Sequence, residues 1–96
     1  MSEAREIRVR RMKMRSMRRG IREMDLILTA FADARLDDMG AGDLDLYDAL
    51  LNENDHDLYQ WVTARIGRNG AQPMGPVSYD ALLGRIAGHA AGRLRR

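Results

Sequence analysis

Apolar residues recur at intervals of three and four along most of the chain, the spacing that places them on one face of an α-helix. The pattern predicts one helix over about residues 5–18, a second ending near Leu36, a third after Gly40, a fourth between Asp55 and Gly67, and a fifth after Ser78. No strand pattern interrupts this series. Because most of the connections are brief, the predicted fold is all-α, a small five-helix bundle.

Each predicted helix carries its own set of candidate core residues. They are Ile7, Met14 and Met17 in the first helix, Met24, Ile27, Leu28, Phe31 and Leu36 in the second, Leu44, Tyr47, Leu50 and Leu51 in the third, Leu58, Trp61, Val62 and Ile66 in the fourth, and Tyr79, Leu82, Leu83, Ile86 and Ala90 in the fifth. Asp43, Asp45 and Asp48 fall outside the apolar stripe of the third helix and are expected to face water. The last helix contains three glycines at about 1 kcal/mol each, so we expect it to fray beyond residue 88.

Residues 18–31 predict a corner between the first two helices. Gly20 can adopt a positive φ without steric penalty, so it is expected to end the first helix as the residue after its C-cap. Arg18 and Arg19 would then lie in the last turn of that helix, where cations suit the helix dipole. Glu23 would fall at about the third position of the second helix and face its unpaired N–H groups.

The sequence predicts no metal site and no enzyme. The two histidines, His56 and His89, belong to different predicted helices, and the chain has no cysteine. A metal site needs three or four converging ligands, so Asp55-His56-Asp57 is interpreted as a helix start, with Asp55 as its N-cap. Gly40 and Ser78 are predicted N-caps of the third and fifth helices. No glycine-rich phosphate loop follows a strand, and the paired carboxylates lie on predicted exposed faces.

Length and composition fit one domain that covers residues 1–96. The chain is 45% apolar, which is ordinary for a small helical protein with one modest core. The lack of cysteine excludes a disulfide framework. No apolar run approaches the roughly 20 residues needed to cross a bilayer, so we expect a soluble protein without membrane insertion. Glu3 and Glu6 count against a transit peptide in the arginine-rich N-terminal segment.

The net charge of +2 hides a strong segregation, because residues 1–22 carry a net +7 and residues 33–57 a net −8. One interpretation is a basic helical nucleic-acid-binding module, since arginines suffice for non-specific phosphate contacts. Against it, the basic segment has no aromatic residue for base stacking, and the acidic segment would repel the same polyanion. A generic helical interaction protein with another partner is a further alternative.

The residues of the corner carry a family resemblance. Arg19-Gly20-Ile21-Arg22-Glu23 resembles the Arg-Gly-x-x-Glu signature of the SdhE-type FAD assembly factors of succinate dehydrogenase. Further matches follow in order over about residues 10–62, namely Asp25, Leu28, Phe31, Leu46-Tyr47, Leu50-Leu51, Asp55, Asp57-Leu58-Tyr59 and Trp61. The chain departs from the family pattern at Gly40-Ala41-Gly42 and at His56, which weakens two helix starts. Beyond Gly67 the resemblance is only a loop and a final helix.

The resemblance implies an assembly factor that binds the flavoprotein subunit of succinate dehydrogenase, or in some bacteria of fumarate reductase, and promotes covalent attachment of FAD to it. FAD would be the cofactor of the partner, with none bound stably by this chain, and nucleic acid would not be a partner. The expected flavoprotein-binding residues are Arg19, Gly20, Arg22, Glu23, Asp25 and Asp55. The expected location is the cytoplasm of a bacterium or the mitochondrial matrix of a eukaryote.

Overall fold

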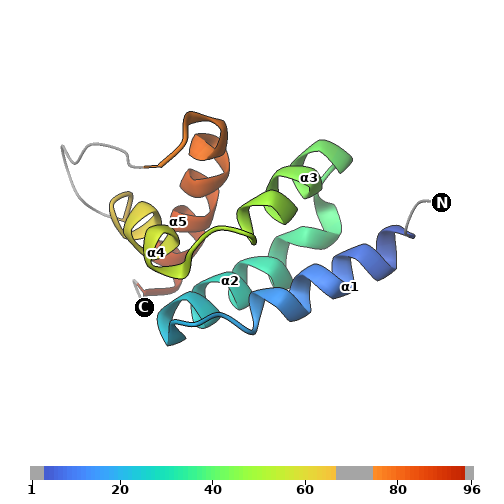
Figure 1. The fold of residues 1–96 in the computed structure, drawn as a ribbon, viewed down its shortest axis with the longest axis horizontal. Coiled ribbons are helices and arrows are strands. Elements are labelled where there is room, and N and C mark those ends of the chain that lie inside the picture. The colour runs from blue at the N-terminus through green and yellow to red at the C-terminus, as the bar shows by residue number, and fades with distance from the viewer. Residues whose placement is uncertain (1–3, 67–74, 95–96) are drawn as a thin grey trace.

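The structure, a computed structural model, describes residues 4–66 and 75–94. These residues form the α-helices α1 (Arg5–Ser16), α2 (Arg22–Arg35), α3 (Ala41–Leu50), α4 (Asp55–Thr63) and α5 (Asp80–Leu94), with 3-10 turns η1 (Leu36–Asp38) and η2 (Val77–Tyr79) (Figure 1). They contain no strand, which confirms the predicted all-α class. None of the helices in this part of the chain is long and apolar enough to cross a membrane.

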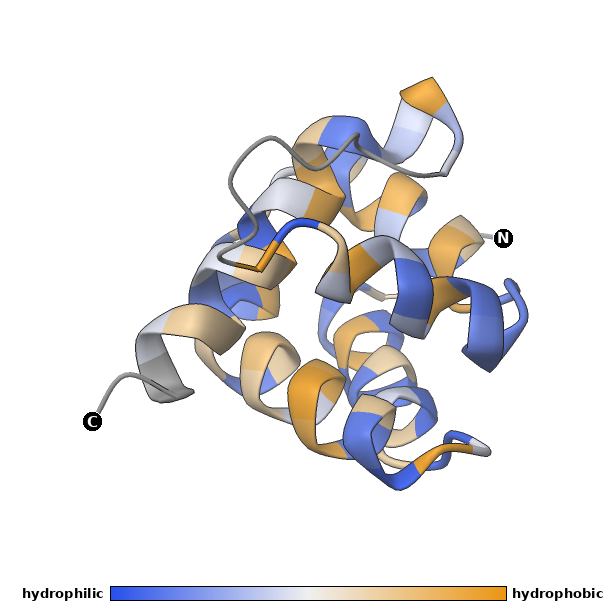
Figure 2. Cartoon of the chain, turned by 90° about the vertical axis from the view of Figure 1, so that its left-hand side faces the viewer, coloured by the Kyte–Doolittle hydropathy of each residue, from blue (hydrophilic) through white to orange (hydrophobic). Residues whose placement is uncertain are grey.

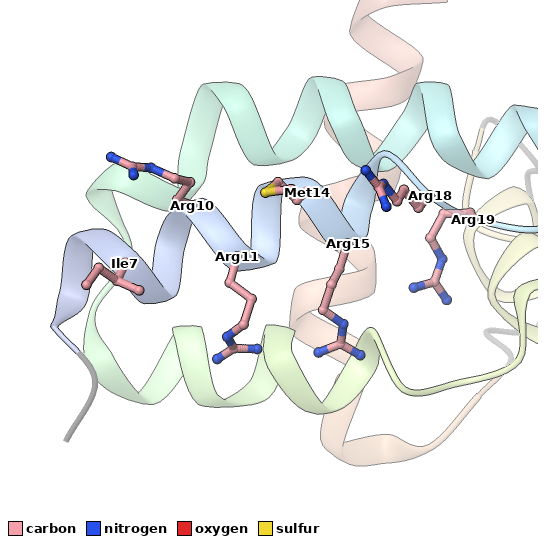
Figure 3. Close-up of a pocket in the computed structure, with 7 residues that line it drawn as sticks. All are labelled: Ile7, Arg10, Arg11, Met14, Arg15, Arg18 and Arg19. Carbon is pink, nitrogen blue, oxygen red and sulfur yellow. The ribbon is translucent and has the colours of Figure 1, made fainter. Parts of the chain in front are cut away.

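The helix α2 is the centre of the arrangement. It packs against α1, α4 and α5, and the corner after α1 makes α1 and α2 lie side by side in opposite directions (Figure 1). The helix α1 packs against α2, and its arginines pair with aspartates of α3, which lies on one side of α1 in the close-up of Figure 3. The helices α4 and α5 pack against each other and against α2, so this central helix has a neighbour on several sides.

All five helices contribute to one hydrophobic core. Figure 2 shows that hydrophobic and hydrophilic residues share each helix, as amphipathic helices require. The largest fully buried side chains include Tyr47 and Phe31, whose ring centroids are 5.9 Å apart. The predicted core residues of α2 to α5 are confirmed, with Ile27, Trp61 and Ile66 only partly buried against the cluster.

The predicted core face of α1 is wrong. Ile7, Met14 and Met17 are 54%, 49% and 57% exposed, whereas Val9, Met12 and Ser16 are buried. Val9, Met12 and Ser16 also follow helical spacing. The helix α1 therefore has two candidate buried faces, and periodicity alone does not show which one is buried.

The buried stripe of α1 contains a hydrogen-bonded serine, Ser16. The Ser16 hydroxyl donates to the Met12 carbonyl at 2.8 Å and lies 2.6 Å from the Tyr47 hydroxyl, which can donate to it, so burial of Ser16 leaves its hydroxyl satisfied. Burial raises the pKa of Tyr47 to about 12.

The opposite charges of the chain meet within the fold. Arg8 lies 2.6 Å from Asp45, and Arg15 lies 2.9 Å from Asp48, so the basic α1 is aligned with the acidic α3. Asp43 pairs with Arg85 of α5 at 3.3 Å. Asp43 and Asp45 are exposed, as expected, whereas the Asp48 side chain is only 25% exposed. The sequence did not predict these ion pairs, through which the charged segments partly neutralise each other.

Several helix ends differ from their predictions. The N-cap of α4 is Asn54, whose side chain accepts bonds from two backbone N–H groups, and not Asp55. Ser78 lies within η2 and is not the N-cap of α5, which runs from Asp80 to Leu94. The fraying of α5 beyond residue 88 stays a prediction. Gly40 is the N-cap of α3, as predicted. The helix α4 ends at Thr63 with Ala64 as its C-cap, so the prediction that it continues to Gly67 is wrong, and Gly67 itself lies outside the described residues.

Candidate functional site

The corner between α1 and α2 has a different geometry from the one predicted. The helix α1 ends at Ser16, so Arg18 and Arg19 lie beyond it and not in its last turn. The N-cap of α2 is Ile21, which makes Glu23 the second helical residue instead of the third. The prediction of a positive φ at Gly20 is also wrong, because Gly75 is the only residue with positive φ in the described part of the chain.

A close contact accounts for the glycine at position 20. The Gly20 N–H donates to Oδ2 of Asp55 at 2.5 Å. A Cβ added to Gly20 would lie 2.9 Å from the same oxygen, closer than real Cβ atoms approach. Glycine is therefore favoured here by the approach of a carboxylate and not by backbone conformation.

Arg19 ties the corner to the segment between α3 and α4. Its side chain is only 8% exposed, and its Nε donates to Oδ1 of Asp55 at 2.6 Å. Its two terminal nitrogens donate to the carbonyls of Leu51 at 2.9 Å and Glu53 at 3.1 Å. In Figure 3 the Arg19 side chain points to the side of α1 on which α3 lies. A guanidinium presents several donors in a fixed plane, so one side chain fixes three acceptors.

Asp25 closes the corner from the side of α2. Its carboxylate accepts a hydrogen bond from the backbone N–H of Arg19. Arg19, Gly20, Asp25 and Asp55 thus form one hydrogen-bonded group, which we call the corner cluster. Both N–H groups of the turn, at Arg19 and Gly20, bind a carboxylate, so the backbone is held in one conformation.

The α3–α4 segment is tied on its other side as well. The Tyr79 hydroxyl donates to the Glu53 carboxylate at 3.0 Å. Burial and this hydrogen bond raise the pKa of Tyr79, which keeps the hydroxyl a donor. The segment that accepts bonds from Arg19 is therefore also fixed to η2, directly before α5.

Arg22 and Glu23 differ from the corner cluster because they are displayed to solvent. Both are exposed, and neither has a hydrogen bond or ion pair among the described residues. The structure thus brings all six predicted site residues to one corner, including Asp55 from 35 positions beyond Gly20. Four of them bind each other, and two present their charges outward. The structure does not test their contact with a flavoprotein, so that role stays a prediction.

A shallow cavity of about 480 Å³ lies along the outer face of α1 (Figure 3). Ile7 and Met14 form its apolar floor, between arginines of the same helix and of the corner. In Figure 3 Arg11 and Arg15 point toward α3, whereas Arg10 and Arg18 lie on the other side of the helix. The residues 4–66 and 75–94 contain no cluster of three or more acidic, histidine or cysteine residues that could hold a metal ion.

Comparison with known proteins identifies the chain. Residues 10–89 match the model of a family described as flavinator of succinate dehydrogenase. The chain belongs to this family. The match includes the corner and α2 to α4, and it extends into α5, beyond the span of residues 10–62 over which the sequence alone showed the resemblance.

Individual members of the family share part of their length with this chain. The protein named succinate dehydrogenase assembly factor 2, mitochondrial, from Meyerozyma guilliermondii is 46% identical over 61 residues, which cover 64% of this chain and 45% of that protein. The protein of the same name from Candida glabrata is 56% identical over 48 residues, or 50% of this chain and 31% of the relative. The one from Mycosarcoma maydis is 41% identical over 64 residues, or 67% and 27%. The matched region thus spans less than half of each of these relatives.

Sequence reasoning missed two features of the site. Asn54 and Asp55 are adjacent, and both residue types are good N-caps. The sequence therefore did not show that Asn54 caps α4 and that the Asp55 side chain binds Arg19 of the corner instead. Leu26 is 62% exposed beside Glu23. Its position outside the apolar stripe of α2 is a signal that could have marked it as a surface residue.

Proposed function

We propose that this protein binds the flavoprotein subunit of succinate dehydrogenase and promotes the covalent attachment of FAD to it. The observation that carries the proposal is the family match over residues 10–89. The names of the relatives, assembly factors of succinate dehydrogenase, agree with it. The part played by the chain would be that of an assembly factor with no catalytic residue of its own. Binding to the flavoprotein subunit of fumarate reductase stays a prediction.

The geometry of the corner supports a preorganised contact surface. The corner cluster holds the backbone around Gly20, so Arg22 and Glu23 project from a fixed position. Preorganisation favours binding because less conformational entropy is lost when the complex forms. Arg22 can bind a partner carboxylate through two parallel hydrogen bonds, and Glu23 can accept from a partner cation. Gly20 is exposed, so a partner can reach the corner at this position.

The residues of the corner divide into two proposed roles. We assign contact with the flavoprotein to Gly20, Arg22 and Glu23, which are exposed. Arg19, Asp25 and Asp55 act as positioning residues in this proposal, because their polar groups bind each other. Direct contact of these three with the flavoprotein, as the resemblance implied, stays a prediction.

The proposed mechanism is a shift of conformational populations. The flavin and the flavoprotein supply the bond-forming chemistry. The assembly factor would bind the arrangement of the flavoprotein that is competent for attachment more tightly than the other arrangements, which raises its population. Only this difference in affinity can produce the shift. The protein would act where the flavoprotein receives its FAD, in a mitochondrial matrix or a bacterial cytoplasm.

Covalent flavin provides the direct experiment. A succinate dehydrogenase flavoprotein subunit is produced with and without this protein, denatured, separated by electrophoresis and examined for flavin fluorescence. Only covalently attached flavin remains on the denatured polypeptide. We expect strong fluorescence only with this protein present. Equal fluorescence in both samples, at equal amounts of flavoprotein, would contradict the proposal.

A further inference from the structure

An apolar groove opens directly beside Glu23, on the side of α2 that faces α4 and α5. It has a volume of about 240 Å³, and its lining includes Glu23, Leu26 and Ile27 of α2, Tyr59 and Thr63 of α4, and Ala90 of α5. Leu26 is 62% exposed and Tyr59 is 36% exposed. These side chains do not complete the core, and they form a continuous apolar surface next to the corner.

The size and chemistry of the groove favour protein side chains over a small molecule. Pockets for small molecules and cofactors usually measure about 300 to 1,000 Å³ and carry several convergent polar groups. This groove is smaller, and Glu23 is the only charged residue among the described residues that line it. Its dimensions suit one or two apolar side chains of a partner.

The Glu23 carboxylate at the edge of the groove indicates which charged residue a bound segment should carry. The Glu23 carboxylate is exposed and has no ion-pair partner in the described part of the chain. A lysine or arginine next to the inserted apolar side chain would pair with it, and partial shielding by the bound segment would strengthen the pair. Glu23 belongs both to the corner and to the groove, so the two surfaces are continuous.

We propose that this groove seats a segment of the flavoprotein in which an apolar side chain inserts between α2 and α4 and an adjacent lysine or arginine pairs with Glu23. The proposal rests on the proposed function and deepens it, because it gives the flavoprotein a second contact point beyond Gly20 and Arg22. Interface hot spots are typically side chains that fill a well-packed pocket and are surrounded by contacts that exclude water.

Substitution of Leu26 tests the apolar contact. Leu26→Gln keeps side-chain length and helix propensity close to those of leucine while removing the apolar surface. The matched control is Val77→Gln, because Val77 is 90% exposed and lies in η2, outside the groove. We expect Leu26→Gln to weaken flavoprotein binding about tenfold or more, and Val77→Gln to leave the dissociation constant unchanged. Thr63→Phe, which fills the groove, should weaken binding to a similar degree.

The outcomes separate this proposal from the proposed function. If the unmodified protein binds the flavoprotein and Leu26→Gln and Thr63→Phe, both folded by circular dichroism, bind equally well, the groove proposal is wrong and the proposed function stands. If the unmodified protein does not bind the flavoprotein at all, the proposed function is wrong and the groove proposal falls with it.

Photo-crosslinking identifies the occupant. The amino acid p-benzoylphenylalanine is placed at position 26, or at position 77 as a control, and the complex with the flavoprotein is irradiated and analysed by mass spectrometry. We expect a crosslink from position 26 to a flavoprotein peptide that has an apolar residue within about one helical turn of a lysine or arginine. A crosslink to a second copy of this chain, to an acidic peptide, or to no peptide while the complex is intact would overturn the proposal.

Discussion

Arginine serves opposite purposes in two neighbouring regions of this protein. In the corner cluster, Arg19 is nearly buried and donates to a carboxylate and two carbonyls. On the outer face of α1, Arg10 and Arg18 are exposed and have no ion pair among the described residues. Arg18 and Arg19 are adjacent in sequence, so residue type and local charge do not decide the role. The decisive partner is Asp55, which approaches from the start of α4.

The largest expected effect is the loss of Arg19. Arg19→Ala removes the donor to Oδ1 of Asp55 and to two carbonyls, so we expect the free energy of unfolding to fall by about 3 kcal/mol. Arg18→Ala is the adjacent control and should change stability by less than about 0.5 kcal/mol. Urea denaturation followed by circular dichroism measures both. Equal small effects of the two substitutions would show that the corner cluster does not stabilise the fold.

The contact between the buried face of α1 and Tyr47 of α3 can be tested by changing the pH. The pKa of buried Tyr47 is about 12, above its ordinary value of 10.0. Between these values the unfolded phenol loses its proton and the folded one keeps it, so the folded state binds more protons and stability falls as pH rises. The contribution is fully present below about pH 10 and is lost by about pH 12, a change of roughly 2 to 3 kcal/mol. Urea denaturation from pH 9 to 12 measures it.

Tyr47→Phe is the matching control for this pH dependence. It retains the ring, and the Ser16 hydroxyl keeps its bond to the Met12 carbonyl. The variant should lose much less stability between pH 10 and 12 than the unmodified protein. An identical alkaline slope in both proteins would assign the effect to other groups.

Alanine substitution of Gly20 and Gly84 should change stability by a smaller amount and in opposite directions, because only Gly20 has a neighbour where the added Cβ would lie. Gly20→Ala places a Cβ against Asp55, and we expect a loss of about 1 kcal/mol as the carboxylate moves away. At Gly84 an added Cβ meets nothing within 4 Å, so Gly84→Ala should stabilise α5 by up to about 1 kcal/mol. Thermal unfolding measures both shifts. Stabilisation by Gly20→Ala would contradict the close approach of Asp55.

The smallest expected signal is nucleic-acid binding by the outer face of α1. Arg8 and Arg15 are paired with aspartates of α3, so fewer arginines of this helix remain for phosphate contacts than the net +7 of its segment suggests. We expect only weak duplex DNA binding at physiological salt. Sub-micromolar affinity with a log–log salt slope steeper than about −4 would support the nucleic-acid alternative.

The fold was predictable where one apolar stripe dominates a helix. The helices α2 to α5 each have such a stripe, and its residues are buried or packed against the core. In α1 two stripes compete, and the buried one contains Ser16, whose hydroxyl meets Tyr47 from 31 positions away. The Ser16 hydroxyl is satisfied by the Met12 carbonyl one turn earlier and by the Tyr47 hydroxyl, and the second of these contacts is not visible in any local pattern.

The sequence predicted which residues form the candidate site, but not what each of them does there. The signature residues and Asp55 do meet at the corner. The position of Gly20 was correct, but the stated reason was wrong, because a carboxylate contact and not a positive φ favours glycine there. The division between the corner cluster and the displayed pair Arg22 and Glu23 depends on contacts across about 35 residues, which appear only in the folded chain.

The most direct test of the central claim is covalent flavin on the flavoprotein in the presence of Glu23→Gln, measured together with the melting temperature of the variant. Asp33→Asn, at an exposed aspartate farther along α2, is the matched control. The account predicts that Glu23→Gln melts within a few degrees of the unmodified protein while covalent flavin falls strongly, and that Asp33→Asn changes neither. Full covalent flavin with Glu23→Gln, or a loss in proportion to lost stability, would contradict the claim that this corner is the contact surface.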